Sequence, residues 1–301
     1  MKKLVKIILV VLCVVVGAAG LSACTWWEKD ILVIARTAGS GTRDAFDTLI
    51  KNEAGDSLAK KADGTAQGSG VFVKTLVEQD NTASVMTKVA ANENSIGYIS
   101  LGSVNETVKV LSVNGVAPSS ETVLDGSYAL KRPFVLATNK TTALSDAAAD
   151  FAAYLNSTEA QAIVEANGYV QFGQHVGYAA PAEVLGGTVK LRGSTSVEPL
   201  MSKLIADYKV KGGASVSGIT FDLDAQGSSA GITAAKNDQE GNVIGMSSSA
   251  LKAADEAALN SFTIALDAVA IIVHNKNKVD NLTIAQIFGI YTGSITKFSK
   301  I

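Results

Sequence analysis

The 301-residue sequence has few cysteines, histidines, prolines and aromatic residues. Its two cysteines are Cys13 and Cys24, and we expect Cys13 to be removed with the N-terminus, so no disulfide is expected in the mature chain. The two histidines, His175 and His274, are not placed with paired cysteines or acids at metal-ligand spacing. We therefore expect no metal site and no cofactor.

An excess of positive charge is also missing. The formal net charge is −2, and because the first 23 residues carry three lysines, the rest of the chain stands at −5. This acidic balance argues against nucleic acid as a partner, so any anion site must be local and built largely from neutral dipoles. With 47% hydrophobic residues, the chain can bury the cores of two lobes or domains.

The N-terminus has the pattern of an export signal. Three lysines precede an apolar run over residues 7–21, which ends in Leu-Ser-Ala-Cys. We predict a signal peptide at residues 1–23. The ending resembles a bacterial lipobox, which would make Cys24 the lipidated first residue of a protein anchored outside the cytoplasm on the cell membrane. An uncleaved anchor, or an ordinary signal with a chance cysteine, are the alternatives.

Four loops rich in Gly, Ser and Thr follow predicted strands. They lie at residues 35–46, 193–196, 227–231 and 245–249, and three of them open predicted helices. N-terminal helix N–H groups, hydroxyls and the guanidinium of Arg36 suit a small, multiply charged oxyanion. Each loop alone is also typical of a plain helix cap. Strands that alternate with helices predict an α/β protein, and convergence of the four loops would surround an anion with donors.

The loops resemble those of the bacterial phosphate-binding proteins that feed the phosphate ABC transporter. The resemblance rests on the segments GSTSVEPL (193–200), GSSAG (227–231), IYTGSIT (290–296) and RTAGSGT (36–42), and it covers nearly the whole mature chain. The order is inverted, because in the family the GSTS-type segment comes first and the RxxGSGT segment follows the YTGxIT segment. This resembles a circular permutation in which residues 173–187 join the family's usual ends.

The resemblance implies a two-lobed α/β fold of the type II periplasmic-binding-protein class, in circularly permuted order. Two crossover strands, near residues 128–133 and 264–270, would join the lobes, with the ligand between them. One lobe would combine residues 25–127 with 269–301, and the other would comprise residues 128–268. Both ends of the mature chain would then lie in the same lobe.

The resemblance also implies the contacts to phosphate, which are helix-end N–H groups, hydroxyls and one arginine. By position in the motifs they are Arg36, Ser40, Gly41, Thr42, Thr195, Ser196, Ser228 and Ser248. Many relatives have an aspartate where Ser248 stands, which accepts the proton of phosphate and repels sulfate, and an acidic residue at the position of Ala38, which holds the arginine. Selectivity for phosphate over sulfate is therefore less secure here. Arg43 and Asp44 are candidates to compensate.

The resemblance thus implies a monomeric extracytoplasmic lipoprotein, not an enzyme, that captures inorganic phosphate and delivers it to an ABC permease. Alternatives are a binding protein for sulfate or molybdate, a phosphate sensor or adhesin, and a serine hydrolase. The hydrolase reading rests on the G-x-S-x-G pattern around Ser229, after which Asp267 and His274 follow in the order of a hydrolase triad.

Overall fold

The computed structural model describes residues 28–68 and 70–301. The predicted signal peptide at residues 1–23 and the predicted lipidation site Cys24 lie outside these residues. Among the helices described, none is both long enough and apolar enough to cross a membrane.

A nine-stranded sheet runs through the molecule, in the order β2-β1-β3-β10-β6-β9-β7-β8, with β4 beside β10; β5 and β11 form a separate pair. The strands are β1 (Leu32–Arg36), β2 (Val77–Gln79), β3 (Ser95–Ser100), β4 (Val108–Val110), β5 (Ser112–Val113), β6 (Lys131–Asn139), β7 (Gly186–Gly193), β8 (Gly218–Asp224), β9 (Val243–Ser247), β10 (Leu259–His274) and β11 (Asn281–Leu282).

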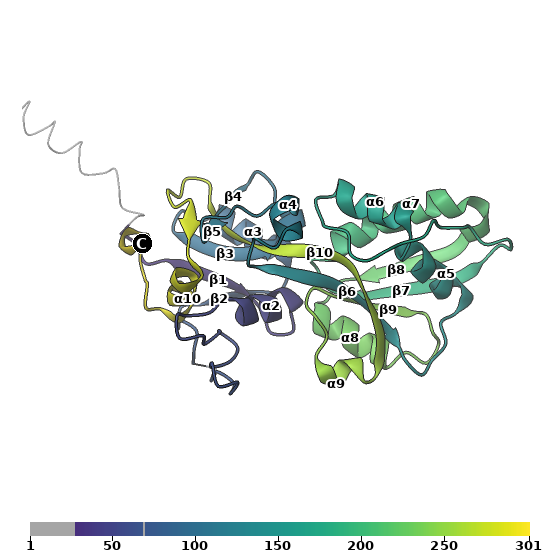
Figure 1. Ribbon diagram of the computed structural model, residues 1–301, viewed down its shortest axis with the longest axis horizontal. Coiled ribbons are helices and arrows are strands. Elements are labelled where there is room, and N and C mark those ends of the chain that lie inside the picture. The colour runs from purple at the N-terminus through teal and green to yellow at the C-terminus, as the bar shows by residue number, and fades with distance from the viewer. Residues whose placement is uncertain (1–27, 69) are drawn as a thin grey trace, which may run out of the picture.

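Helices cover both ends of this sheet (Figure 1). The α-helices are α2 (Gly41–Leu49), α3 (Thr82–Ala90), α4 (Ser120–Leu124), α5 (Asp146–Leu155), α6 (Thr158–Ala166), α7 (Glu198–Gly212), α8 (Ser228–Lys236), α9 (Ala253–Glu256) and α10 (Ile284–Thr292). Three short 3₁₀ turns are η1 (Leu101–Ser103), η2 (Gly213–Val216) and η3 (Phe298–Lys300). Short polar residues such as Ser145 and Ser157 begin α5 and α6, because their hydroxyls accept otherwise unpaired backbone N–H groups.

Two strands, β6 and β10, connect the two lobes of the molecule (Figure 1). Residues 269–273 of β10 pair with β3, whereas residues 259–268 pair with β6, which in turn pairs with β9. The predicted α/β fold with two crossover strands is therefore confirmed. Pro133 lies in β6 where it pairs with β10, and β9 joins only from Val135 onward, so the missing N–H of the proline interrupts no three-stranded pairing.

The register of the crossover strands brings the carboxyl ends of β3 in one lobe and β9 in the other close together. In β3, residues closer to the carboxyl end pair with β10 residues closer to Val269. In β9, residues closer to the carboxyl end pair with β6 residues closer to Lys131, which itself pairs with Ala268. Loops at the carboxyl ends of both strand sets therefore meet midway along β10, which is where ligands bind in open α/β sheets.

Each lobe has its own hydrophobic core. One core contains Phe46, Tyr98 and Tyr291, and the rings of Phe46 and Tyr98 stack with their centroids 3.8 Å apart. The other contains Phe151 and Tyr208, at a centroid distance of 4.9 Å. Strand β10 contributes to both cores, with Ala268 and Val269 in the first and Ile264 and Ala265 in the second.

The two ends of the described chain lie together in the first of these lobes. The N–H of Ile31 donates to the carbonyl of Thr296 at 2.7 Å, and Lys297 lies 4.0 Å from Glu28. Residues 173–185, most of the predicted joining segment, contain no helix or named strand, and β7 begins at Gly186. This placement of the ends is the one that a permuted order requires.

Candidate functional site

The loop between β1 and α2 presents Arg36, Ser40, Gly41 and Thr42 at the interface of the lobes. Gly39 turns the chain with a φ of 87°, and the hydroxyl of Ser40 caps α2 by accepting the N–H of Arg43 at 3.4 Å. Gly41 begins the helix with its own N–H directed across the interface. A Cβ atom on Gly41 would lie 2.4 Å from Ser228 Oγ, so only glycine allows this approach.

Two helix N-termini of the other lobe lie opposite. Helix α7 follows Thr195 and Ser196, and helix α8 begins at Ser228 after Gly227, which has a φ of 103°. Neither helix has a side-chain cap, whereas Ser40 caps α2. The N–H groups of Glu198 and Ser229 already donate to the carbonyls of Ser194 and Gly39. The partial positive charge of a helix N-terminus still favours an anion near the starts of α7 and α8.

Hydroxyl groups from both lobes form one buried cluster between these loops. Thr42 Oγ1 lies 2.9 Å from Ser196 Oγ and 3.5 Å from Ser248 Oγ. The N–H of Gly41 donates to Ser228 Oγ at 3.1 Å, and Ser228 Oγ lies 3.4 Å from Ser248 Oγ. These groups come from three loops of one lobe and one helix of the other, and all are buried.

Thr82 belongs to the same cluster although the sequence pattern does not assign it to the site. Residues 82–91 predict a helix with Thr82 as its possible cap, but Asn81 caps α3 by accepting the N–H of Ser84 at 2.8 Å. This frees the Thr82 hydroxyl, which lies 3.3 Å from both Thr195 Oγ1 and Ser196 Oγ. In the sequence, the only indication of this role is that Thr82 is a polar residue at the start of a helix that follows a strand.

Arg36 is the fixed cation beside this cluster and is only 2% exposed. Its guanidinium donates to the backbone carbonyls of Gln79 at 3.2 Å and Asp80 at 2.6 Å, and to Thr82 Oγ1 at 3.5 Å. These carbonyls take the place of an acidic residue at Ala38. Burial lowers the pKa of Arg36 to about 10, which leaves it charged at neutral pH.

An aromatic cluster fixes the strand that carries Arg36. The backbone N–H of Arg36 donates to the hydroxyl of Tyr98 at 3.1 Å, and the hydroxyl of Tyr291 donates to the carbonyl of Ile34 at 3.0 Å. Both rings pack with Phe46 of α2. The cation and the helix that follows it are therefore held by one rigid core.

Arg43 does not point into the hydroxyl cluster. It pairs with Asp47 at 2.7 Å and with Glu78 at 3.1 Å, and it donates to the carbonyl of Arg36 at 2.7 Å. Burial raises the pKa of Asp47 to about 6, against the opposing effect of Arg43. Arg43 therefore holds the backbone of Arg36 in place. It does not replace the acidic residue that many relatives have at the position of Ala38.

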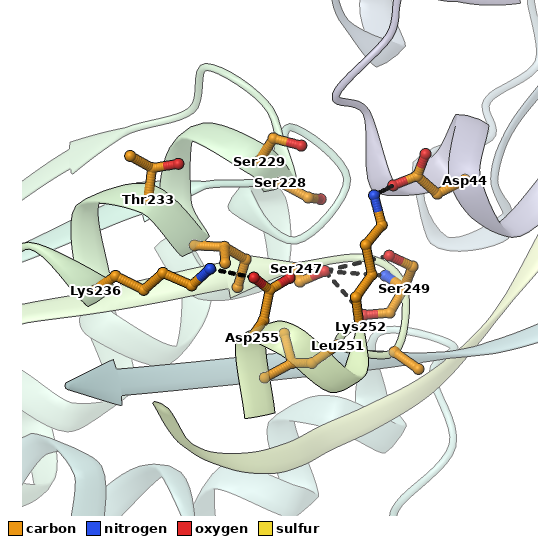
Figure 2. A pocket seen from close by; sticks show the side chains of 12 residues that line it. Asp44, Ser228, Ser229, Thr233, Lys236, Ser247, Ser249, Leu251, Lys252 and Asp255 are labelled. Atoms are coloured by element: carbon orange, nitrogen blue, oxygen red, sulfur yellow. Dashed lines mark hydrogen bonds and ion pairs between the residues drawn. The ribbon is translucent and has the colours of Figure 1, made fainter. Parts of the chain in front are cut away.

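Asp44 lies on the rim of the interface and lines a pocket of about 240 Å³. Figure 2 shows the side chains around this pocket. Lys252 reaches from the other lobe to within 3.8 Å of Asp44. Lys236 and Asp255 pair inside the pocket, and Ser247 Oγ donates to the carbonyl of Ser249 at 2.8 Å. Asp44 thus bridges the lobes through an exposed ion pair and, like Arg43, lies apart from the hydroxyl cluster.

A second buried arginine, which the sequence pattern does not single out, lies behind Ser248. Arg132 in β6 binds Oδ2 of Asp267 in β10 through two nitrogens, at 3.0 and 2.8 Å. Its remaining nitrogen, Nη1, donates to the carbonyl of Ser248 at 3.1 Å. Asp267 is therefore a paired, hydrogen-bonded residue of the crossover strands.

The geometry does not support the hydrolase alternative. Asp267 is held by Arg132, and His274 Nδ1 accepts the backbone N–H of Lys276 at 3.0 Å. The N–H of Ser229 donates to the carbonyl of Gly39 at 3.0 Å, which makes this residue part of the contact between lobes. Within residues 28–68 and 70–301, no hydrogen bond joins Ser229 to either triad candidate.

Known proteins are similar to this chain in sequence and in fold. A family model described as a PBP superfamily domain matches residues 25–159 and 179–300. The phosphate-binding protein PstS 2 of Streptococcus pneumoniae serotype 4 is 38% identical over 273 residues, which cover 90% of this chain and 87% of the relative. PstS 2 of Streptococcus agalactiae serotype V is 34% identical over 273 residues, which also cover 90% of this chain and 87% of the relative. A crystal structure of a phosphate-binding protein of a phosphate ABC transporter from S. pneumoniae TIGR4 matches with a TM-score of 0.66 and 37% identity, covering 90% of this chain and 99% of that one.

Proposed function

Because this chain belongs to the phosphate-binding proteins of the PBP superfamily, we propose that it captures inorganic phosphate between its two lobes and delivers it to an ABC permease. The observation that carries the proposal is the buried hydroxyl cluster, in which Thr42 of one lobe meets Ser196 and Ser248 of the other beside the fixed cation Arg36. Such a set of donors matches a small tetrahedral oxyanion.

The eight residues implied by the resemblance would act together on the anion. The N–H groups at the starts of α2, α7 and α8 would donate along the helix axes, with hydroxyl donors between them. Arg36 would supply the compensating charge, and Thr82 joins this set through its bond to Arg36. The hydroxyls now contact one another, so the anion would replace these contacts when the lobes close around it.

Binding and release would follow from a hinge motion at the two crossover strands. We take residues 25–127 with 269–301 as one lobe and residues 128–268 as the other. Two separate cores support two lobes, although Tyr128, Leu130, Val170 and Ala268 belong to the core of the first. The contacts that parting the lobes would break include the hydroxyl cluster, the bond from Gly41 to Ser228 and the bond from Ser229 to the Gly39 carbonyl. Phosphate would then favour the closed state by its contacts to both sides.

The remaining parts of the proposal concern the setting of the protein. We place it outside the cytoplasm, as a monomer tethered through lipidated Cys24, with the permease as its membrane partner and without enzymatic activity. A sensor or adhesin on the same scaffold would bind the same anion without the permease. Uptake of labelled phosphate by cells that lack the gene would separate these roles, because only a transport role requires that uptake falls.

Sulfate is the second ligand to consider, because the cluster consists of hydroxyl groups, which do not repel a fully ionised anion. Among the described residues, no carboxylate forms a hydrogen bond to the clustered hydroxyls, and Ser248 stands where many relatives have an aspartate. A hydroxyl can accept the proton of phosphate but does not repel a fully ionised anion. Molybdate shares the tetrahedral geometry and belongs to the same test.

Isothermal titration calorimetry of the purified chain with phosphate, sulfate and molybdate tests the proposal. We expect heat with phosphate and tighter binding of phosphate than of sulfate. Arg36→Ala should remove most of the binding, because it deletes the fixed cation, whereas Ser229→Ala should keep it. Absence of heat with phosphate, or equal affinity for sulfate, would contradict the proposal. Ester hydrolysis that is lost in Ser229→Ala would support the hydrolase instead.

A further inference from the structure

The pair formed by Arg132 and Asp267 lies at the hinge itself. The two residues face each other as neighbours in β6 and β10, and only 1% of each side chain is exposed. The crossover strands also pass between the lobes here, because residues 269–273 of β10 pair with the other lobe. A charge placed at this point lies directly behind Ser248 of the anion site.

Arg132 reaches the anion site through Ser248. Its Nη1 donates to the Ser248 carbonyl at 3.1 Å, and the Ser248 N–H donates to Ser228 Oγ at 3.2 Å. The positive charge of Arg132 also contributes to the lowered pKa of Arg36, although burial is the larger cause. The two guanidinium groups therefore act on the same buried space.

The two carboxylate oxygens of Asp267 differ in their hydrogen bonds. Its Oδ2 accepts both bonds from Arg132, whereas its buried Oδ1 has no hydrogen-bond partner among the described residues. Burial raises the pKa of Asp267, against the opposing effect of Arg132. Ser100 and the backbone N–H of Ala268 also lower this pKa, but less than Arg132 does, so Asp267 acts chiefly as the counter-charge of Arg132.

We propose that Arg132 is a positioning residue of the anion site and that Asp267 limits the positive charge that the anion meets. Arg132 holds the Ser248 loop in place and adds positive potential behind it. Asp267 offsets that potential, so the pair sets the affinity for a multiply charged anion and keeps release possible. This inference rests on the proposed binding of an oxyanion at the hydroxyl cluster.

The two partners should then change affinity in opposite directions. Asp267→Asn keeps the shape and leaves Arg132 uncompensated, so we expect phosphate binding to tighten about tenfold, as one added unit charge within reach of a buried site allows. Arg132→Gln removes the charge and the bond to Ser248, so binding should weaken about tenfold or more. A purely structural pair would lose affinity in both variants.

Calorimetry with phosphate at pH 8 measures these changes, and thermal unfolding reports stability separately. Asp238→Asn is the matched control for Asp267, because Asp238 is also buried but binds the backbone N–H groups of Gly241 and Val243 instead of an arginine. Arg192→Gln is the control for Arg132, since Arg192 forms a more exposed pair with Asp222. Both controls should leave the affinity within about twofold of the original.

Further variants keep the test decisive. Arg132→Lys retains the charge and should recover part of the affinity lost in Arg132→Gln, and it replaces that variant if Arg132→Gln does not fold. Weaker binding in both Asp267→Asn and Arg132→Lys would overturn the inference while leaving the proposed function intact. If the unchanged protein takes up no oxyanion in the same calorimeter, the proposed function fails, and this inference fails with it.

Discussion

Gly41→Ala should separate closure of the lobes from their stability. A Cβ atom at this position would lie 2.4 Å from Ser228 Oγ, 2.9 Å from Ser248 Oγ and 3.0 Å from the Ser248 backbone nitrogen. The last of these atoms belongs to the backbone of the other lobe, so it cannot rotate away as a side chain could. The added methyl group therefore has room only if the two loops move apart.

The cost should fall on the closed state alone. Gly41 is the first residue of α2 and its φ is not positive, so alanine fits its backbone and favours the helix. Forcing a methyl group into a packed contact costs about 1–3 kcal/mol. Since about 1.4 kcal/mol corresponds to a factor of ten, phosphate affinity should fall by roughly 5- to 150-fold. The free energy of unfolding should change by less than about 1 kcal/mol.

Calorimetry with phosphate and urea unfolding together measure the two quantities, and small-angle scattering reports whether phosphate still compacts the variant. Gly68→Ala is the control, because a Cβ at Gly68 meets no atom within 4 Å and its φ is not positive. If Gly41→Ala binds phosphate as tightly as the unchanged protein, the lobes do not close through this contact. The assignment of the hydroxyl cluster as the closed anion site would then be refuted.

Three smaller changes test the surroundings of the site. Tyr98→Phe removes the acceptor of the Arg36 N–H and should cost about 1–3 kcal/mol in urea unfolding, because that buried N–H loses its partner; an unchanged midpoint would contradict this. The pKa of Asp47 is raised to about 6, so the folded state binds more protons than the unfolded state, and stability should fall as pH rises from about 4 to 6. Asp47→Asn should flatten this slope in urea unfolding at several pH values, and an unaltered slope would assign it to another group. Lys252→Ala should change phosphate affinity less than about threefold in calorimetry, because the pair with Asp44 is exposed; a larger loss would show that this pair holds the lobes together.

Local patterns predicted the elements of the fold well. Serine is a preferred residue at a helix start, and α5 and α6 begin directly after Ser145 and Ser157. The apolar run over residues 262–273 is typical of a buried strand, and β10 is longer still and extends over Leu259–His274. Its extra residues pair with β6, and that pairing depends on residues more than one hundred positions away. Strand ends set by such partners leave little trace in the sequence itself.

Some parts of the site follow from local residue preferences, and other parts depend on residues far away in the sequence. The Gly-Ser-Thr loops were found because turns and helix starts have their own residue preferences. Arg132 was missed because it follows Lys131 and resembles a solvated charge, whereas its burial depends on Asp267 in another strand. The partners that replace an acid at Ala38 were invisible for a different reason, since backbone carbonyls such as that of Asp80 have no residue signature.

The lengths of the contacts between lobes explain why an anion would hold this interface closed. A hydroxyl–hydroxyl bond is normally 2.7–2.8 Å long. Only the pair of Thr42 and Ser196 approaches this, at 2.9 Å, while Thr82 lies 3.3 Å from its two partners and Ser248 lies 3.5 Å from Thr42. These donors are desolvated but poorly paired, and charged oxygens form shorter and stronger bonds than hydroxyls do. Phosphate would therefore bring to both lobes at once the acceptors that neither lobe supplies to the other.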